Sequence, residues 1–198
     1  MFKYEPYRPE LKKDPRLISF MLMHKRSTFM HVDFALFTPS VPTPIPHPCQ
    51  ANVICTSVYN CWFGSFSSDG ENPDYEMLQG RKPYDFKKVH MKNGIWIGNA
   101  IIQDVKRARR LIFIPAYIYH VYSIISQNYQ KVTNIGERSY NYYDVLLAMK
   151  NSPHTFTITD GTSCLQDIPN VELCSFPYAK LLVDILNNLF DDFKKEKK

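Results

Sequence analysis

The chain has 198 residues, of which 44% are hydrophobic and 22% charged, and its formal net charge is +5. This composition excludes a wholly disordered chain, because disordered chains contain few apolar residues and carry a high net charge. We predict a single globular domain over 1–198, with 1–16 as an extended N-terminal arm and 194–198 as a frayed, lysine-rich tail. Five cysteines, an odd number, and no apolar secretory segment near the N-terminus predict a reduced, cytoplasmic protein.

Two runs in the first third of the chain are typical of β-strands. Residues 29–37 alternate between apolar and polar, with His31 and Asp33 on the polar face. Residues 52–63 form a second β-rich run. Between these runs, 39–48 contains five prolines, which predicts a polyproline II strap packed on its own domain.

The middle of the chain combines a polar tract with its most basic and most apolar clusters. Residues 64–81 are predicted to form a surface loop with a short helix at 75–78. Residues 99–110 are predicted to form a helix, with cations crowding the last turn, where they favour the negative end of the helix dipole. The β-branched and aromatic run 111–125 predicts a pair of buried strands divided by Pro115, which cannot donate to a ladder.

The same apolar segment has some features of a membrane span. Leu111–Gln130 contains no ionisable side chain other than tyrosine and His120, follows the basic stretch KRARR, and is just long enough to cross a bilayer. Pro115, several polar residues and four tyrosines argue against a span, because polar groups are costly in hydrocarbon. We therefore expect no transmembrane segment.

The last third of the chain contains the clearest helix signal. Residues 142–150 have helical spacing and 154–159 alternate as a strand. Residues 177–195, capped by Ser175, carry one continuous apolar stripe. The predicted fold class is α+β: a mostly antiparallel sheet from strands near 29–37, 52–63, 111–125 and 154–159, packed by helices near 99–110, 142–150 and 177–195.

Two basic clusters interleaved with aromatic residues give the leading functional hypothesis. Cations neutralise phosphates or carboxylates, and aromatic rings stack on bases. We therefore expect a binding protein whose anionic partner is nucleic acid or an acidic protein surface. The predicted binding residues are Arg81, Lys82, Tyr84, Lys87, Lys88, Lys92, Lys106, Arg107, Arg109 and Arg110.

The alternative hypothesis is a cysteine- or histidine-dependent enzyme of transferase or hydrolase type. A thiol nucleophile needs a lowered pKa and a nearby base that a carboxylate orients. Cys61 or Cys55 would be the nucleophile, His31 or His154 the base, and Asp33 or Asp160 the orienting group.

No metal or cofactor is expected. His47, Cys49, Cys55 and Cys61 are residue types that bind zinc, but zinc ligands usually come in closely spaced pairs on a turn. On the predicted strand, Cys55 and Cys61 would lie roughly 20 Å apart. The sequence also lacks the usual phosphate-binding, zinc-protease and serine-hydrolase motifs.

Overall fold

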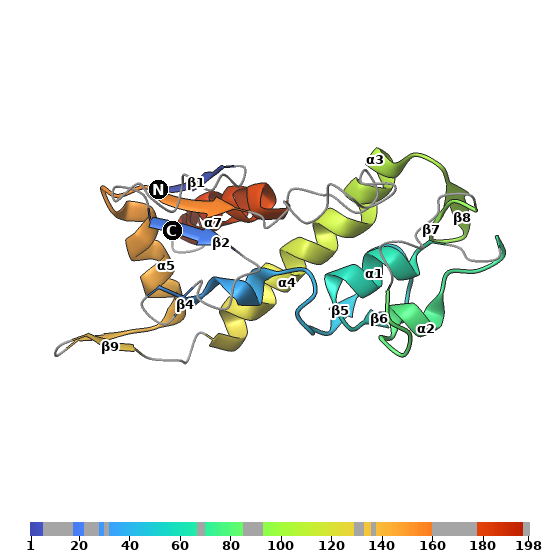
Figure 1. Ribbon diagram of the computed structural model, residues 1–198, viewed down its shortest axis with the longest axis horizontal. Helices are drawn as coiled ribbons and strands as arrows, with labels where there is room; N and C mark the ends of the chain where they lie inside the picture. Colours follow the sequence, from blue (N-terminus) through green and yellow to red (C-terminus); the bar gives the residue numbers. More distant parts are fainter. Residues whose placement is uncertain are drawn as a thin grey trace. The chain divides into compact units, whose positions relative to one another are not determined.

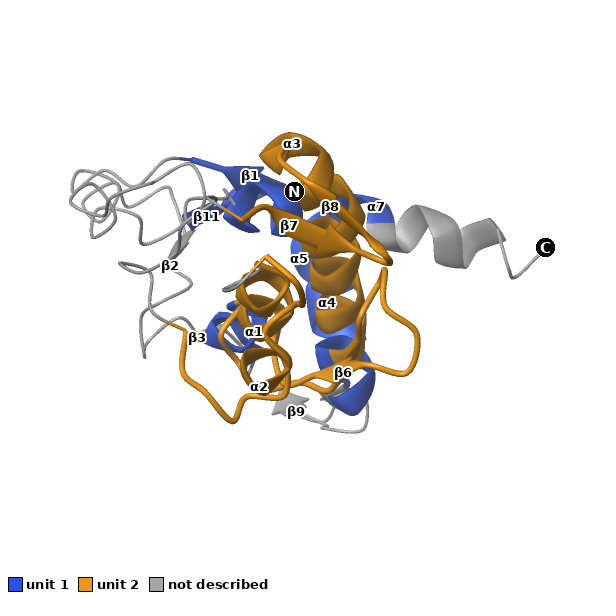
Figure 2. Cartoon of the chain, turned by 90° about the vertical axis from the view of Figure 1, so that its right-hand side faces the viewer, with its two compact units in different colours: residues 1–38, 124–164, 177–198 blue, residues 39–123, 165–176 orange. Residues whose placement is uncertain are grey.

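We analysed a computed structural model, which describes residues 1–5, 18–21, 28–29, 32–66, 70–84, 93–128, 133–135, 138–159 and 178–195. The chain divides into two compact units (Figure 2). Unit 1 comprises Met1–Thr38, Ile124–Cys164 and Pro177–Lys198, and unit 2 comprises Pro39–Ser123 and Leu165–Phe176. The expectation of one domain over 1–198 stays a prediction.

Unit 1 is built around a three-stranded parallel sheet with the order β1-β11-β2 (Figure 1). In the register of this sheet, Phe156 of the central strand lies beside Phe2 on one side and Ile18 on the other. The elements of unit 1 are β1 Phe2–Tyr4, β2 Ile18–Met21, β3 Thr28–Phe29, β4 Val32–Asp33, the 3₁₀ helix η2 Phe34–Phe37, β9 Thr133–Ile135, β10 Arg138–Tyr140, α5 Tyr142–Asn151, β11 Phe156–Thr159 and α7 Tyr178–Lys195.

Aromatic rings and one amphipathic helix form the core of unit 1. Phe2 contacts the rings of Phe34 and Phe156, and Phe37 contacts Tyr142. Helix α7 packs on β1 and β11 with Leu182, Ile185 and Leu186 buried, as its apolar stripe predicts. Phe2 thus docks the N-terminal segment on the sheet. Ser175, the predicted cap of α7, lies outside the described residues.

Unit 2 is mainly helical, with two small antiparallel ladders, β5 with β6 and β7 with β8. Its described elements are β5 Ile45–Pro46, β6 Ile54–Cys55, α1 Val58–Gly64, α2 Tyr75–Leu78, β7 Ile95–Ile97, β8 Ala100–Ile102, α3 Val105–Ala108, the π-helical turn η3 Arg109–Phe113 and α4 Ile114–Asn128, which continues into unit 1.

The proline-rich strap packs on its own unit, which confirms the prediction. Thr43, Ile45 and His47 are buried, whereas the prolines that alternate with them along 42–48 are exposed. Ile45 also pairs with Cys55 in the β5–β6 ladder. The prolines therefore face solvent, where a missing N–H group costs nothing, and the residues between them carry the contacts.

The α+β fold class and helices α2, α5 and α7 are confirmed, and four of the six strand pairs among the described residues are antiparallel. Three element predictions are wrong in part. Residues 34–37 form η2 instead of continuing a strand, because the Asp33 side chain accepts the N–H of Ala35. Residues 58–63 form α1, because the Ser57 hydroxyl caps the N–H of Asn60. Residues 99–102 belong to a hairpin that turns at Gly98, which has φ +59°.

The largest correction concerns 111–125, which is helical and not a pair of strands. Its buried residues come in neighbouring pairs every four positions, namely 112–113, 116–117, 120–121 and 124–125. That spacing matches one face of a helix with 3.6 residues per turn. Within the described residues, no helix is long and apolar enough to cross a membrane.

Candidate binding surface

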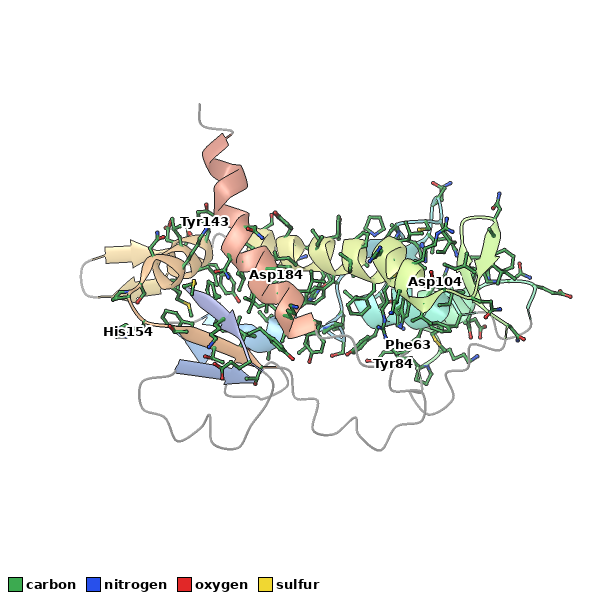
Figure 3. The ribbon with its side chains drawn as sticks, turned by 90° about the horizontal axis from the view of Figure 1, so that it is seen from above. Phe63, Tyr84, Asp104, Tyr143, His154 and Asp184 are labelled. Atoms are coloured by element: carbon green, nitrogen blue, oxygen red, sulfur yellow. The ribbon has the colours of Figure 1, made fainter. Side chains whose placement is uncertain are left out.

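The helix from Val105 to Asn128, which runs from unit 2 into unit 1, carries exposed cations and exposed apolar side chains in its unit 2 part. It begins at Asp104, whose carboxylate accepts the N–H of Arg107 at 3.0 Å and so satisfies one of the free donors of the first turn (Figure 3). It then continues through the π turn η3 into α4 without leaving helical dihedral angles.

The π turn lies next to Pro115. The N–H of Ile114 reaches back five residues to the carbonyl of Arg109, and Pro115 has no N–H to offer Leu111. The Leu111 carbonyl instead accepts a hydrogen bond from the thiol of Cys49 at 3.3 Å. Burial raises the pKa of Cys49, so the thiol keeps the proton that this bond needs. Cys49, directly after the strap, therefore replaces the helical bond that proline removes.

The inward side of the helix is fixed by aromatic and polar contacts. Phe113 meets Trp62 of α1 edge to face and stacks on Tyr117, with ring centroids 6.1 and 6.0 Å apart. The buried ring of His120 binds the hydroxyl of Thr43 through Nδ1 at 3.0 Å. These contacts determine which side of the helix remains exposed.

The outward side combines three cations with four large apolar side chains. Lys106, Arg107 and Arg110 are exposed in the first turns of the helix. Exposed apolar residues follow toward the C-terminus, at positions i, i+7, i+8 and i+11: Leu111 (38%), Ile118 (37%), Tyr119 (46%) and Tyr122 (38%). We call these seven residues the helix surface.

The π turn brings the two kinds of side chain onto the same side. Arg110 and Ile118 are eight residues apart, and a π turn holds one residue more than an α turn. The remaining seven residues make about two α-helical turns, so the two positions face the same way. Residues 105–128 contain no Asp or Glu, so the charge of this segment has one sign.

The first predicted basic cluster, within 81–92, is less available for contact with a partner. Arg81 and Lys82 are exposed after α2, but the Lys82 ammonium pairs with Asp74 at 2.8 Å. Tyr84 is half-buried, stacking on Phe63 and meeting Tyr59 edge to face, and burial raises the pKa of its phenol (Figure 3). Arg109 is also half-buried. Lys87, Lys88 and Lys92 lie outside the described residues.

The predicted nucleophiles lie in the core of unit 2. Cys55 and Cys61 are fully buried and hydrogen-bonded to each other, because α1 folds back beside β6 instead of extending the strand. The bond to Cys55 and burial raise the pKa of Cys61 well above that of an ordinary thiol. An activated thiol needs the opposite shift. The described residues contain no group of three or more potential metal ligands.

The predicted bases and carboxylates are placed as follows. Asp33 caps η2, and its carbonyl accepts the hydroxyl of Tyr142. His154 is exposed after α5 in unit 1, whereas both cysteines belong to unit 2 (Figure 3). His31 and Asp160 lie outside the described residues.

Sequence reasoning missed one buried polar arrangement. His47 accepts the N–H of Cys49 at Nδ1, and its Nε2 lies 2.9 Å from the Ser65 hydroxyl, which donates to the Cys61 carbonyl at 2.7 Å. Because Nδ1 is an acceptor, neutral His47 carries its proton on Nε2 and donates to Ser65. A serine nucleophile needs an imidazole that accepts its proton, so these bonds join the strap to α1 and do not form a catalytic pair.

No protein-family model matches the chain, and no curated protein or solved structure matches it significantly.

Proposed function

We propose that the chain is a binding protein whose unit 2 presents Lys106, Arg107 and Arg110 to an anionic partner. The observation that carries this proposal is the exposure of all three cations on one helix. The nearest carboxylate in sequence, that of Asp104, is already engaged as the helix cap. Their charge is therefore available for contact with a partner.

The partner we favour is an acidic protein surface, in preference to nucleic acid. Binding to single strands needs aromatic rings exposed beside the cations, so that bases can stack on them. The ring of Tyr84 is used in packing against Phe63, and Trp96 is half-buried in β7. The exposed apolar side chain nearest to the cations in sequence is the aliphatic Leu111, whereas the exposed rings of Tyr119 and Tyr122 lie nine and twelve residues beyond Arg110. An apolar side chain beside cations suits a protein partner better.

The test measures binding of the full-length chain to fluorescent poly-L-glutamate, single-stranded DNA and duplex DNA as salt is raised. The triple variant Lys106→Glu, Arg107→Glu, Arg110→Glu should lose at least tenfold in affinity for poly-L-glutamate. The control Lys194→Glu, Lys195→Glu, Lys197→Glu changes the net charge equally and should lose much less. Equal losses would mean that net charge alone causes binding, which would refute the proposal.

A second comparison concerns the first basic cluster. Arg81→Glu with Lys82→Glu should weaken binding less than Arg107→Glu with Arg110→Glu, because Asp74 already neutralises Lys82. Tighter binding to either DNA than to poly-L-glutamate, with a steep loss as salt rises, would identify nucleic acid as the partner instead.

The buried thiols do not favour the enzyme hypothesis, because a thiol with a raised pKa stays protonated near neutral pH. If Cys55 or Cys61 alkylated near neutral pH much faster than the other cysteines in the folded chain, catalysis would need to be reconsidered.

A further inference from the structure

We infer that the helix surface binds an acidic amphipathic helix of a partner protein. This inference rests on the proposed function and adds the apolar half of the surface to it. The three cations occupy one end, and Leu111, Ile118, Tyr119 and Tyr122 continue toward the other. From Lys106 to Tyr122 the surface spans roughly 24 Å at the rise of an α-helix, which equals about four turns of a partner helix.

The backbone of this surface determines the secondary structure of the occupant. A helix satisfies its own N–H and C=O groups, so it offers no free edge to which an extended peptide could add as a strand. Side chains at i, i+7, i+8 and i+11 form a ridge that a second helix can follow at a small crossing angle over several turns. A helical occupant therefore uses the whole length of the surface.

The charge of the surface determines the composition of the occupant. Lys106, Arg107 and Arg110 require Asp or Glu at the end of the partner helix that faces them. The rest of that helix should present Leu, Ile, Phe or Met at helical spacing to Ile118 and Tyr119. The contact area is small, which predicts a weak, transient complex.

A lipid surface fits less well. An interfacial helix buries its apolar side chains about 5–10 Å into the boundary of the acyl chains. Ile118 and Tyr119 are 37% and 46% exposed, so neighbouring groups of the chain already cover more than half of the surface of each. Side chains held in this way favour a protein partner whose own side chains pack between them.

The experiment selects binders to the full-length chain from a random library of 20-residue peptides displayed on phage. Peptides that are enriched on the wild type are made synthetically, and their affinities are measured by fluorescence anisotropy. We expect helical peptides with acidic residues at one end and apolar residues at i, i+3 or i+4, and i+7. Ile118→Asp with Tyr119→Asp, and separately the triple cation variant, should each weaken binding at least tenfold.

The matched control is Ile54→Asp with Tyr75→Asp. These residues are also an exposed isoleucine and an exposed tyrosine of unit 2, at 54% and 48% exposure. The control should keep wild-type affinity. Circular dichroism and thermal melting of each variant establish that lost binding is not lost folding.

Three outcomes would overturn the inference. The first is that the peptides bind the Ile118→Asp, Tyr119→Asp variant as tightly as the wild type, or that selection enriches no peptide on the wild type over that variant. Either result would mean that the apolar half of the helix surface does not contact the partner. If only the triple cation variant weakens binding, the proposed function stands and the amphipathic partner is wrong. Binding to vesicles of phosphatidylserine and phosphatidylcholine that Ile118→Asp, Tyr119→Asp abolishes would assign the surface to a membrane.

Discussion

Gly64 lies where α1 meets α2, and a side chain has no room there. A Cβ atom at this position would come within 2.6 Å of the Leu78 side chain and 2.7 Å of its backbone nitrogen. The Leu78 nitrogen belongs to the backbone of α2, which cannot shift without an energetic cost. Gly64→Ala should therefore lower the free energy of unfolding by about 1–3 kcal/mol, measured by urea denaturation, and Gly64→Leu by more.

Gly70 provides the control for this prediction. Among the described residues, no atom outside the adjoining backbone lies within 4 Å of a Cβ built there, but its φ of +89° strains most residues other than glycine. Gly70→Ala and Gly70→Leu should cost about the same, roughly 1–2 kcal/mol. If the loss of unfolding free energy at Gly64 did not grow with side-chain size, the Leu78 side chain would have to move aside to make room.

His47 should make unit 2 sensitive to acid. Burial lowers its pKa from 6.5 to about 4, so the folded chain resists protonation of this ring while the unfolded chain accepts it. The unfolded state then binds more protons between about pH 6.5 and 4, and the stability contributed by neutral His47 falls as pH falls through this window.

The measurement compares urea denaturation of the wild type and of His47→Asn at pH 7, 5.5 and 4.5. Carboxylates and the other histidines titrate in both proteins, so the difference between the two isolates His47. The wild type should lose stability relative to the variant as pH falls. Parallel losses would mean that water reaches the ring in the folded state.

At the scale of elements, α7 depends on its buried stripe. Leu186 is fully buried, whereas Leu181 on the same helix is only partly buried. Leu186→Ala should cost about 2–5 kcal/mol by loss of contacts and creation of a cavity, and Leu181→Ala clearly less. If Leu186→Ala caused no loss beyond experimental error in denaturation experiments, α7 would lie outside the cooperative core of unit 1.

Local signals were enough to predict the elements whose faces differ. Helix α5 was predicted from its helical spacing, and the structure adds a capping box in which Asn141 and Asp144 bind each other's backbone N–H groups. Helix α7 has one apolar stripe and an otherwise polar surface. Helix α1, in contrast, is buried on nearly all sides from Val58 to Gly64, so its sequence shows no helical period. Short apolar runs of this kind cannot be assigned from pattern alone.

The strand prediction for 111–125 is wrong for a different reason, which bears on the candidate site. Ile118, Tyr119 and Tyr122 lie on the exposed side of the helix, where polar residues would have revealed the period. The apolar side chains that make this surface a candidate for binding also hid the helix. Lys106, Arg107 and Arg110 are exposed on this helix, as long charged side chains are in either kind of element.

At the scale of the whole molecule, the two units can be followed by separate probes. Both tryptophans, Trp62 and Trp96, belong to unit 2, so their fluorescence reports that unit, whereas circular dichroism reports both. Phe2 is buried in the core of unit 1. Phe2→Ala should cost about 3–5 kcal/mol there.

We therefore expect Phe2→Ala to shift the dichroism transition to lower urea much more than the fluorescence transition. Trp62→Phe offers the converse test, with Trp96 as the remaining probe of unit 2. If both probes shifted equally in Phe2→Ala, the chain would unfold as the single cooperative domain that its length predicts.

The parallel sheet of unit 1 also determines when that unit can form on the ribosome. Its central strand β11 is synthesised 135 residues after the end of β2, between Met21 and Phe156. At about 5–20 residues per second, β1 and β2 wait roughly 7–30 s for the strand that joins them. Residues 39–123 of unit 2 emerge during that interval and contain their own helices and hairpin. The order of translation therefore favours folding of residues 39–123 before the sheet of unit 1 is complete.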